Sequence, residues 1–324
     1  MATKNAALQL IQENQEKTPL VDRVQNEATR AGLTQGAIAK EAGVSPAVVT
    51  RWLKGAYPGD VAAVDRKMAR WLDARELRRQ VDARLPEAPG WVDTPTSARI
   101  LAALAYAQMA GDVAVIYGTA GLGKTAALKR QGVLSPNVWV VTMGPAFAGV
   151  ASALQEVAET IGLREVPGRA ARLHREIVQR LRDTRGLLAI DEAQHLSVPA
   201  LEAMRALHDA TGVGLALAGN ETVYARLTGG SRSITFAQMF SRIGKRLHLT
   251  RPSAEDVRAL AVAWGLARPE EQAVLVDIAR QPGALRAVTK TLRLAGMFAS
   301  GEEPAVGIEP KHLRAAWRDL GGEA

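Results

Sequence analysis

A phosphate-binding loop is the clearest chemical signal in this sequence of 324 residues. Residues 118–125 read GTAGLGKT and match the pattern G-x-x-x-x-G-K-[ST], between the apolar run DVAVIY and the helical stretch AALKRQ. In such a loop, backbone N–H groups and a helix N-terminus surround phosphate oxygens. We therefore predict a site for ATP and Mg²⁺, in which Lys124 reaches the β- and γ-phosphates and the Thr125 hydroxyl binds the metal. The predicted nucleotide-binding residues are Gly118, Thr119, Ala120, Gly121, Leu122, Gly123, Lys124 and Thr125.

Two acidic residues end a later apolar run. Residues 187–192 read LLAIDE, as expected of a buried strand that presents carboxylates at its C-terminal edge. Carboxylates at this position can hold Mg²⁺ through water and polarise the water that attacks a phosphate. We predict that Asp191 holds the metal and Glu192 activates the water, while an ordinary solvated loop start is the alternative.

Two further positions resemble the sensor residues of AAA+ ATPases. Asn220 follows the apolar run 214–219 and resembles the residue that orients the attacking water or the γ-phosphate, although asparagine also caps helices and builds turns. Arg286, in the segment PGALR, resembles the lid arginine that closes over the γ-phosphate, and a surface arginine is the alternative. We predict that both act in catalysis beside Glu192.

The segment FSRIGKR, residues 240–246, holds a candidate arginine finger. Arg242 and Arg246 recur four residues apart and would share one face of a helix. An arginine finger stabilises transition-state charge on the nucleotide of a neighbouring subunit, so this role makes hydrolysis depend on oligomerisation. We prefer Arg242, and a solvated or DNA-facing basic stripe is the alternative.

Apolar runs alternate with helical stretches through the middle of the chain. The runs DVAVIYG, NVWVVTM, GLLAIDE and GLALAGN predict a parallel sheet covered by helices. After Pro252 the strand-like runs cease, and a helix is expected with Ser253 as its cap and Asp256 at its third position. Further helices are expected from about Pro269, Ala284 and Pro310. We predict an α/β fold: an AAA+ P-loop ATPase with a parallel sheet and a helical C-terminal lid, preceded by a small all-α helix-turn-helix domain.

A segment rich in proline and glycine, LPEAPGWVDTP, interrupts the helical pattern and reads as a linker. The predicted domains are residues 1–84 (an N-terminal helical arm and the helix-turn-helix), 85–97 (the linker), 98–250 (the ATPase core) and 251–324 (the lid).

Residues 33–55 have the pattern of a helix-turn-helix, with Ser45 as N-cap and Pro46 at the first position of the second helix. That helix would expose Arg51 and Lys54, which suit phosphates, but few side chains that read bases. We predict weak or non-specific DNA contact through Arg51 and Lys54, with protein docking as the alternative. The predicted core residues are Ile38, Ala39, Val44, Val49, Trp52 and Leu53.

A second basic stretch, residues 164–185, contains seven arginines against three acidic residues. In an AAA+ ring or helix this part of the chain faces the central channel, so Arg169 and Arg172 are candidate phosphate contacts. A solvated helix face explains the charges equally well. The loop TGGSRS, residues 228–233, offers Arg232 as a third candidate or forms a bare turn.

Composition limits the remaining possibilities. A formal net charge of +8 and a pI of about 10.0 favour a polyanionic partner. The absence of cysteine excludes disulfides and thiolate zinc sites. No window approaches the ~18 apolar residues that a membrane span requires, and the N-terminus lacks a signal-peptide pattern. We expect a protein of a reducing cytoplasm that has no membrane contact.

With these segments in this order, the chain resembles the phage Mu B type of transposition protein. The match runs from about residue 20 to the end, and the segments FSRIGKR and TGGSRS carry most of its specificity. The resemblance implies ATP-dependent, largely sequence-independent binding to double-stranded DNA, homo-oligomers in a filament or ring, and delivery of target DNA to a transposase that stimulates hydrolysis. The loops around residues 164–172 differ, so individual DNA contacts are not carried over.

Two other functions stay open. A helicase loader or replication initiator of the same superfamily would carry a dedicated helicase-binding arm, which the sequence does not show. A nucleotide-switched transcription regulator would need a recognition helix rich in base-reading side chains, which residues 45–54 lack. Target-DNA binding for a transposase therefore fits the sequence better than either.

Overall fold

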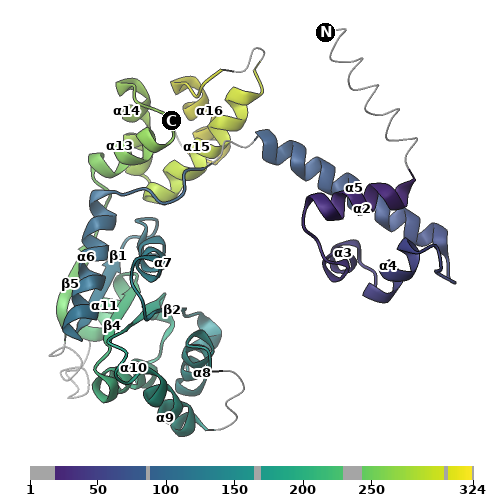
Figure 1. The fold of residues 1–324 in the computed structure, drawn as a ribbon. Coiled ribbons are helices and arrows are strands. Elements are labelled where there is room, and N and C mark those ends of the chain that lie inside the picture. The colour runs from purple at the N-terminus through teal and green to yellow at the C-terminus, as the bar shows by residue number, and fades with distance from the viewer. Residues whose placement is uncertain (1–18, 85–87, 164–168, 229–242, 303–305, 323–324) are drawn as a thin grey trace. The chain divides into compact units, whose positions relative to one another are not determined.

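The computed structural model describes residues 19–84, 88–163, 169–228, 243–302 and 306–322 (Figure 1). Contacts divide the chain into an N-terminal unit, Met1–Pro86, and a C-terminal unit, Glu87–Ala324. The division lies within the linker expected at residues 85–97, although helix α6 already begins at Pro95. The expected N-terminal arm, residues 1–18, lies outside the described residues.

The N-terminal unit is all-α where it is described. Its helices are α2 (Leu20–Arg30), α3 (Gln35–Ala42), α4 (Pro46–Leu53) and α5 (Val61–Arg84). Helices α3 and α4 form the predicted helix-turn-helix, and the Ser45 side chain accepts a hydrogen bond from the Val48 N–H, as expected of an N-cap. The predicted core is confirmed, because Ile38, Ala39, Val49 and Trp52 are buried and Val44 and Leu53 pack against them. Val24 of α2 and Met68 of α5 complete it.

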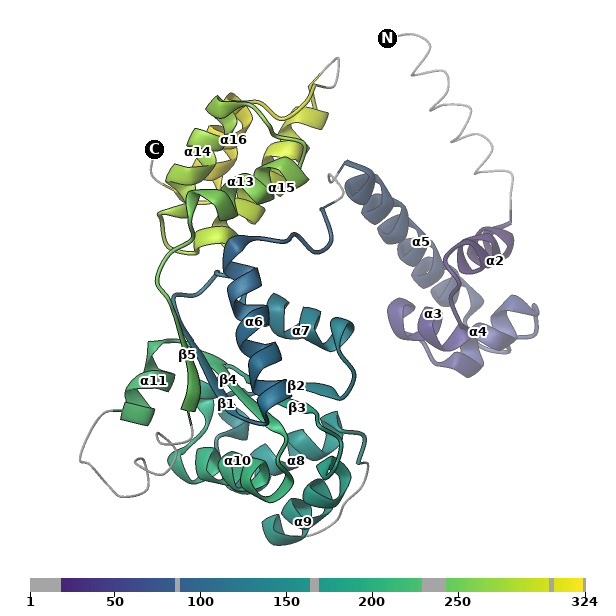
Figure 2. The same ribbon diagram turned by 60° about the vertical axis from the view of Figure 1, so that its left-hand side comes forward.

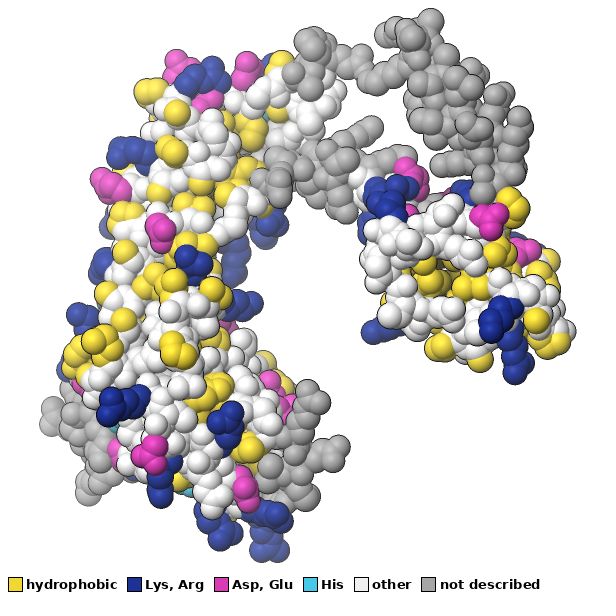
Figure 3. All heavy atoms as spheres, viewed as in Figure 1, with side chains coloured by type: hydrophobic (Ala, Val, Ile, Leu, Met, Phe, Trp, Pro, Cys, Tyr) yellow, Lys and Arg dark blue, Asp and Glu magenta, His cyan; other side chains and the backbone are white. Residues whose placement is uncertain are grey.

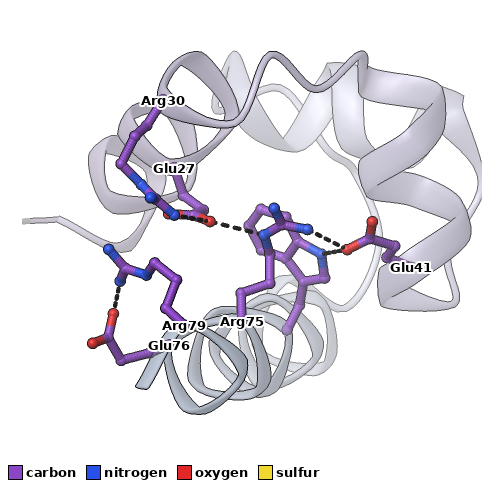
Figure 4. Close-up of polar contacts among 7 residues, drawn as sticks. Glu27, Arg30, Glu41, Arg75, Glu76 and Arg79 are labelled. Carbon is purple, nitrogen blue, oxygen red and sulfur yellow. Dashed lines mark hydrogen bonds and ion pairs between the residues drawn. The ribbon is translucent and has the colours of Figure 1, made fainter. Parts of the chain in front are cut away.

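An ion-pair network holds α2 and α3 against α5 (Figure 4). Arg75 donates through Nε to Glu27 at 2.8 Å and through Nη1 to Glu41 at 2.9 Å, and Trp71 donates to the same Glu41 oxygen at 2.9 Å. Burial raises the pKa of Glu27, but hydrogen bonds from Arg75 and Arg30 outweigh it, so this pKa lies below its ordinary value. Substitution of Arg75 would leave the Glu41 carboxylate without its cation, so we expect such a change to destabilise the N-terminal unit.

The C-terminal unit is built on a parallel sheet. Its described strands are β1 (Val113–Gly118), β2 (Val138–Thr142), β3 (Leu187–Asp191), β4 (Gly214–Gly219) and β5 (Ile243–Leu249), in the order β2-β3-β4-β1-β5. Strands β1, β3 and β4 are buried along their whole length, as expected of strands covered on both faces.

Helices cover both faces of this sheet (Figures 1 and 2). Helices α6 (Pro95–Ala110) and α7 (Lys124–Leu134) pack on one face through residues such as Ile100 and Leu128. Helices α8 (Val150–Thr160), α9 (Ala170–Leu181) and α10 (Val198–Thr211) pack on the other. Short 3₁₀ turns, η1 (Pro145–Phe147) and η2 (Ala193–His195), follow β2 and β3, and α11 (Glu221–Thr228) follows β4.

Strand β5 corrects one prediction. The segment 240–246 was expected to be helical with Arg242 and Arg246 on one face, but residues from Ile243 onward form an edge strand beside β1. Ile243, Leu247 and Leu249 are buried while the residues between Ile243 and Leu247 are exposed, and the register with β1 shifts near its start. The helical prediction was wrong because pairing with β1 supplies the backbone partners that decide the conformation of this short segment.

Helices α13 (Ala254–Ala263), α14 (Pro269–Ala279), α15 (Ala284–Ser300) and α16 (Pro310–Asp319) form the lid, with a core of their own. The last three begin at the predicted residues. The predicted cap is also present, since the Ser253 hydroxyl accepts from Asp256 N and Asp256 Oδ2 accepts from Ser253 N. None of the helices in the described ranges has both the length and the apolar character to cross a membrane.

Candidate nucleotide-binding site

The predicted phosphate-binding loop connects the end of β1 to the start of α7. Gly118 and Gly121 have φ angles of 130° and 84°, in the region that favours glycine. A Cβ at Gly118 would collide with the carbonyl oxygen of Leu249 in β5, and one at Gly121 would collide with the carbonyl oxygen of Gly283. The loop therefore packs closely between the edge strand and the segment that starts α15, so the lid contacts the phosphate site directly.

Lys124 is the first residue of α7, and its side chain folds back over the loop. Its Nζ donates to the carbonyl oxygens of Gly118 at 2.9 Å and Thr119 at 2.8 Å. Burial lowers the pKa of Lys124, and the nearby carboxylates of Glu192 and Asp191 act in the opposite direction. An ammonium held this close to the loop is positioned to bind phosphate oxygens.

Thr125 and Asp191, the two predicted metal-binding residues, lie together. The Thr125 hydroxyl donates to Asp191 Oδ2 at 2.7 Å, and Asp191 is 2% exposed. Burial raises the pKa of Asp191, against hydrogen bonds from Thr125 and the Glu192 N–H. A hydroxyl and a carboxylate are hard oxygen ligands that fit Mg²⁺, which is commonly held by one or two protein groups together with substrate phosphates. The described residues contain no cluster of three or more His, Asp or Glu side chains that would hold a metal without such help.

Glu192 follows directly at the strand end, with φ 53° in the left-handed region. Its N–H donates to Asp191 Oδ1 at 3.0 Å, and its carboxylate accepts a hydrogen bond from the Gln194 side chain. Both Glu192 and Gln194 line the same cavity as Lys124. The structure thus brings the predicted base to the phosphate loop.

This cavity has a volume of about 630 Å³ and lies between the sheet and the lid. One wall is apolar and comes from the segment before α6 and from α13. Its residues are Trp91, Val92, Leu260 and Trp264. Arg286 and Arg293 of α15 and Lys129 of α7 add positive charge to the lining. A cavity of this size, with phosphate-binding groups at one end and apolar side chains nearby, fits a nucleotide.

The two tryptophans are among the lining residues that the sequence did not predict. Trp91 lies in the segment APGWVDTP, which was interpreted only as a linker, and Arg130 lies 5.6 Å from its ring centroid. Trp264 is the C-cap residue of α13. A tryptophan in an otherwise polar, proline-rich linker was the available signal for Trp91, whereas Trp264 resembles an ordinary helix residue.

The predicted sensor residues both line the cavity. Asn220 follows β4, and its Oδ1 accepts a hydrogen bond from Thr222 N at 2.9 Å, so it also caps α11 as the alternative interpretation held. Arg286 is exposed in the first turn of α15, beside Gly121. Arg246 lies on the exposed edge of β5 and is not among the lining residues. The preferred arginine finger, Arg242, and the loop residue Arg232 lie outside the described residues.

The remaining candidate DNA contacts lie on exposed helix surfaces. Arg51 and Lys54, at the end of α4, are exposed in the N-terminal unit. Arg169, which precedes α9, and Arg172 within it are exposed in the C-terminal unit, and Arg172 pairs with Glu176 at 4.0 Å. Figure 3 shows basic side chains gathered at the end of the C-terminal unit that α9 forms. These surfaces suit phosphate contacts.

Comparison with known proteins adds independent information. Residues 241–320 match the family model of the Mu B transposition protein, C terminal, and residues 108–227 match the AAA domain. The chain is 38% identical over 297 residues to the ATP-dependent target DNA activator B of Escherichia phage Mu, covering 92% of each protein. It is 36% identical over 275 residues to the Mu-like prophage FluMu DNA transposition protein B of Haemophilus influenzae, covering 84% of this chain and 94% of that one.

Among solved structures, Cdc6p from Pyrobaculum aerophilum matches with a TM-score of 0.56 and 18% identity, covering 74% of this chain and 71% of that one. This likeness concerns the fold alone. Together with the five-stranded parallel sheet of the described residues, it confirms the predicted AAA+ fold with a helical lid.

Proposed function

The chain belongs to the family of Mu B transposition proteins, and we propose that it is an ATP-dependent DNA-binding protein that delivers target DNA to a transposase and activates it. The 38% identity to the target DNA activator B of phage Mu, extending over 92% of both chains, carries this proposal. The nucleotide site supports it, because the residues predicted for phosphate binding, with the exception of Thr119, line one cavity, and Asp191 accepts a hydrogen bond from one of them, Thr125. The proposed setting is the cytoplasm of a bacterial host.

The proposed chemistry is hydrolysis of ATP to ADP and phosphate. Lys124 would bind phosphate oxygens in place of the loop carbonyls, and Thr125 and Asp191 would hold Mg²⁺, which would neutralise phosphate charge. Glu192 accepts a proton from the attacking water. Asn220 and Arg286 orient the water and the γ-phosphate from opposite sides of the cavity.

Hydrolysis is completed between subunits in this proposal. An arginine finger, assigned to Arg242, acts on the nucleotide of a neighbouring copy, so turnover requires a homo-oligomer. ATP bound between copies stabilises a filament or ring, and hydrolysis releases it. ATP binding, rather than hydrolysis, is then the step that allows the protein to assemble on DNA.

DNA is bound largely through its phosphates and with little sequence preference. Arg169 and Arg172 beside α9, and Arg232, are the proposed contacts in the C-terminal unit, and Arg51 and Lys54 add weak contacts from the helix-turn-helix. Such contacts make affinity fall steeply with salt, because each neutralised phosphate releases counterions.

Two substitutions test this function. Lys124→Ala should abolish ATP-dependent assembly on DNA, since it removes the cation that binds the phosphates. Glu192→Gln should retain assembly and block turnover, since it removes only the proton acceptor. Electron microscopy on duplex DNA and phosphate release measure the two properties separately. Assembly by the Lys124→Ala protein at wild-type ATP concentrations would contradict the site assignment.

A further inference from the structure

The Gln194 side chain forms hydrogen bonds both with the predicted base, Glu192, and with the end of the neighbouring strand β4. It lies in η2, directly after β3, and its side-chain nitrogen donates to Glu192 Oε2. Its side-chain oxygen accepts from the Asn220 N–H at 3.3 Å, at the end of β4. One amide thus connects the Glu192 carboxylate to the backbone of the residue that occupies the sensor position.

The end of β4 leaves room for this amide. A Cβ at Gly219 would collide with Oε1 of Gln194 and would lie 2.5 Å from Cγ2 of Val223. Only a glycine at this position lets the Gln194 side chain approach the strand closely enough to reach the Asn220 N–H. The contact therefore depends on a specific residue of β4 as well as on Gln194 itself.

We propose that Gln194 is a positioning residue for ATP hydrolysis, which holds the Glu192 carboxylate in the orientation that accepts a proton from water. This inference rests on the proposed function, in which Glu192 is the base. A glutamate side chain has three rotatable bonds, and a base must lie within hydrogen-bond reach of the proton that it abstracts. Gln194 holds Oε2 and leaves Oε1 for the water.

The same amide links the base to the γ-phosphate sensor. Gln194 bonds both to the Glu192 carboxylate and to the N–H of Asn220, so the position of the base is tied to the backbone at the end of β4. Lys124 bonds to the loop carbonyls and Thr125 bonds to Asp191, whereas Gln194 bonds to Glu192, so we expect its loss to affect the chemical step rather than nucleotide binding.

The test compares two variants in the full-length protein. Gln194→Ala removes the side chain, whereas Gln194→Glu keeps its size but replaces the donor with an acceptor. Both should lower kcat by about tenfold or more, as expected when a general base loses its orientation. Both should keep the KM for ATP and ATP-dependent DNA binding within about twofold of wild type, because the phosphate-binding groups are unchanged. His195→Ala, in the same turn, is the matched control and should leave kcat unchanged.

A double-mutant cycle separates positioning from a general structural effect. In a Glu192→Gln background, Gln194→Ala should cause no further loss of single-turnover rate, since the base that it orients is already absent. An equal additional loss in this background would overturn the inference, as would wild-type kcat in Gln194→Glu or a parallel loss of ATP binding. If Glu192→Gln itself keeps wild-type turnover, the base assignment fails and the inference with it. Wild-type turnover by Gln194→Ala beside an inactive Glu192→Gln overturns the inference alone.

Discussion

Asp256 joins the lid to the sheet domain, and replacing it should destabilise the C-terminal unit. Its carboxylate is 0% exposed and accepts hydrogen bonds from Thr96 N, Thr96 Oγ1 and Ser253 N, each at 2.7 Å. Thr96 lies in the first turn of α6 and Ser253 caps α13, so the N-termini of two helices converge on one anion. Such a site favours negative charge.

The size of the effect follows from these bonds. In Asp256→Asn, the amide oxygen can still accept a hydrogen bond from Thr96 N. The Thr96 hydroxyl, which donates to the carboxylate in the wild type, can instead accept a hydrogen bond from the new amide nitrogen. The Ser253 N–H, however, then faces this amide nitrogen, which is also a donor. A hydrogen bond to a charged group contributes about 1.5–3 kcal/mol, and a buried donor left unpaired costs a similar amount, so we expect a loss of about 2–3 kcal/mol at pH 7. For a unit of this size the loss corresponds to a Tm lower by about 5–10 °C.

The effect should depend on pH. Burial alone would raise the pKa of Asp256, but the hydrogen bonds from Thr96 and Ser253 outweigh it, and the pKa lies below its ordinary value. A carboxyl whose pKa is depressed on folding stabilises the protein above its unfolded pKa, about 3.9, and this contribution is lost as the pH falls through the folded value. The Tm difference between wild type and Asp256→Asn should therefore be largest at neutral pH and shrink below about pH 4.

Thermal unfolding followed by circular dichroism, from pH 7 down to the lowest pH at which wild type still unfolds cooperatively, measures this difference. Asp277→Asn is the matched control, because Asp277 pairs with Arg280 on the surface and both side chains are more than 70% exposed. ATP affinity should also fall in Asp256→Asn, since Leu260 of the same helix and its C-cap residue Trp264 line the cavity. An Asp256→Asn protein with the Tm of the Asp277→Asn control, or a Tm difference that does not change with pH, would refute this reasoning.

Three further outcomes follow from the site. Gly121→Ala should weaken ATP binding by more than tenfold in a titration with a fluorescent analogue, because a Cβ there meets lid backbone, whereas Gly132→Ala, with only an ordinary contact at 3.9 Å, should not. Arg169→Ala and Arg172→Ala should each weaken binding to all duplexes alike and reduce the slope of log K against log salt by about 1, and unchanged slopes would remove them from the DNA surface. Trp91→Ala should raise the KM for ATP several-fold at unchanged kcat in steady-state assays, and a lower kcat would show that Trp91 does more than bind nucleotide.

The parts of the site that follow one another along the chain could be predicted from sequence. The phosphate loop, the acidic pair at the end of β3 and the helix starts of the lid are local patterns, because their chemistry depends on spacing within a few residues. Ser253 and Asp256 show the limit of this reasoning. Their capping box was predicted, but the contact of Asp256 with Thr96, 160 residues away, was not.

What could not be predicted depends on pairing across the fold. The first part of β5, residues 243–246, was expected to be helical, because four-residue spacing of arginines is visible in the sequence whereas pairing with β1 is not. The contact of Gly121 with Gly283 and the position of Trp264 in the cavity likewise arise only when the lid packs against the phosphate loop. Trp264 has no local pattern that points to a site, and the motif around Gly121 does not reveal which backbone it meets.

The most direct test of the central proposal is binding of the wild-type protein to several unrelated DNA duplexes at one fixed salt concentration, with ATP, with ADP and without nucleotide. We predict tight binding to every duplex with ATP and much weaker binding in the other two conditions. Binding that does not depend on nucleotide, or that is confined to one sequence, would contradict it and favour a transcription regulator instead.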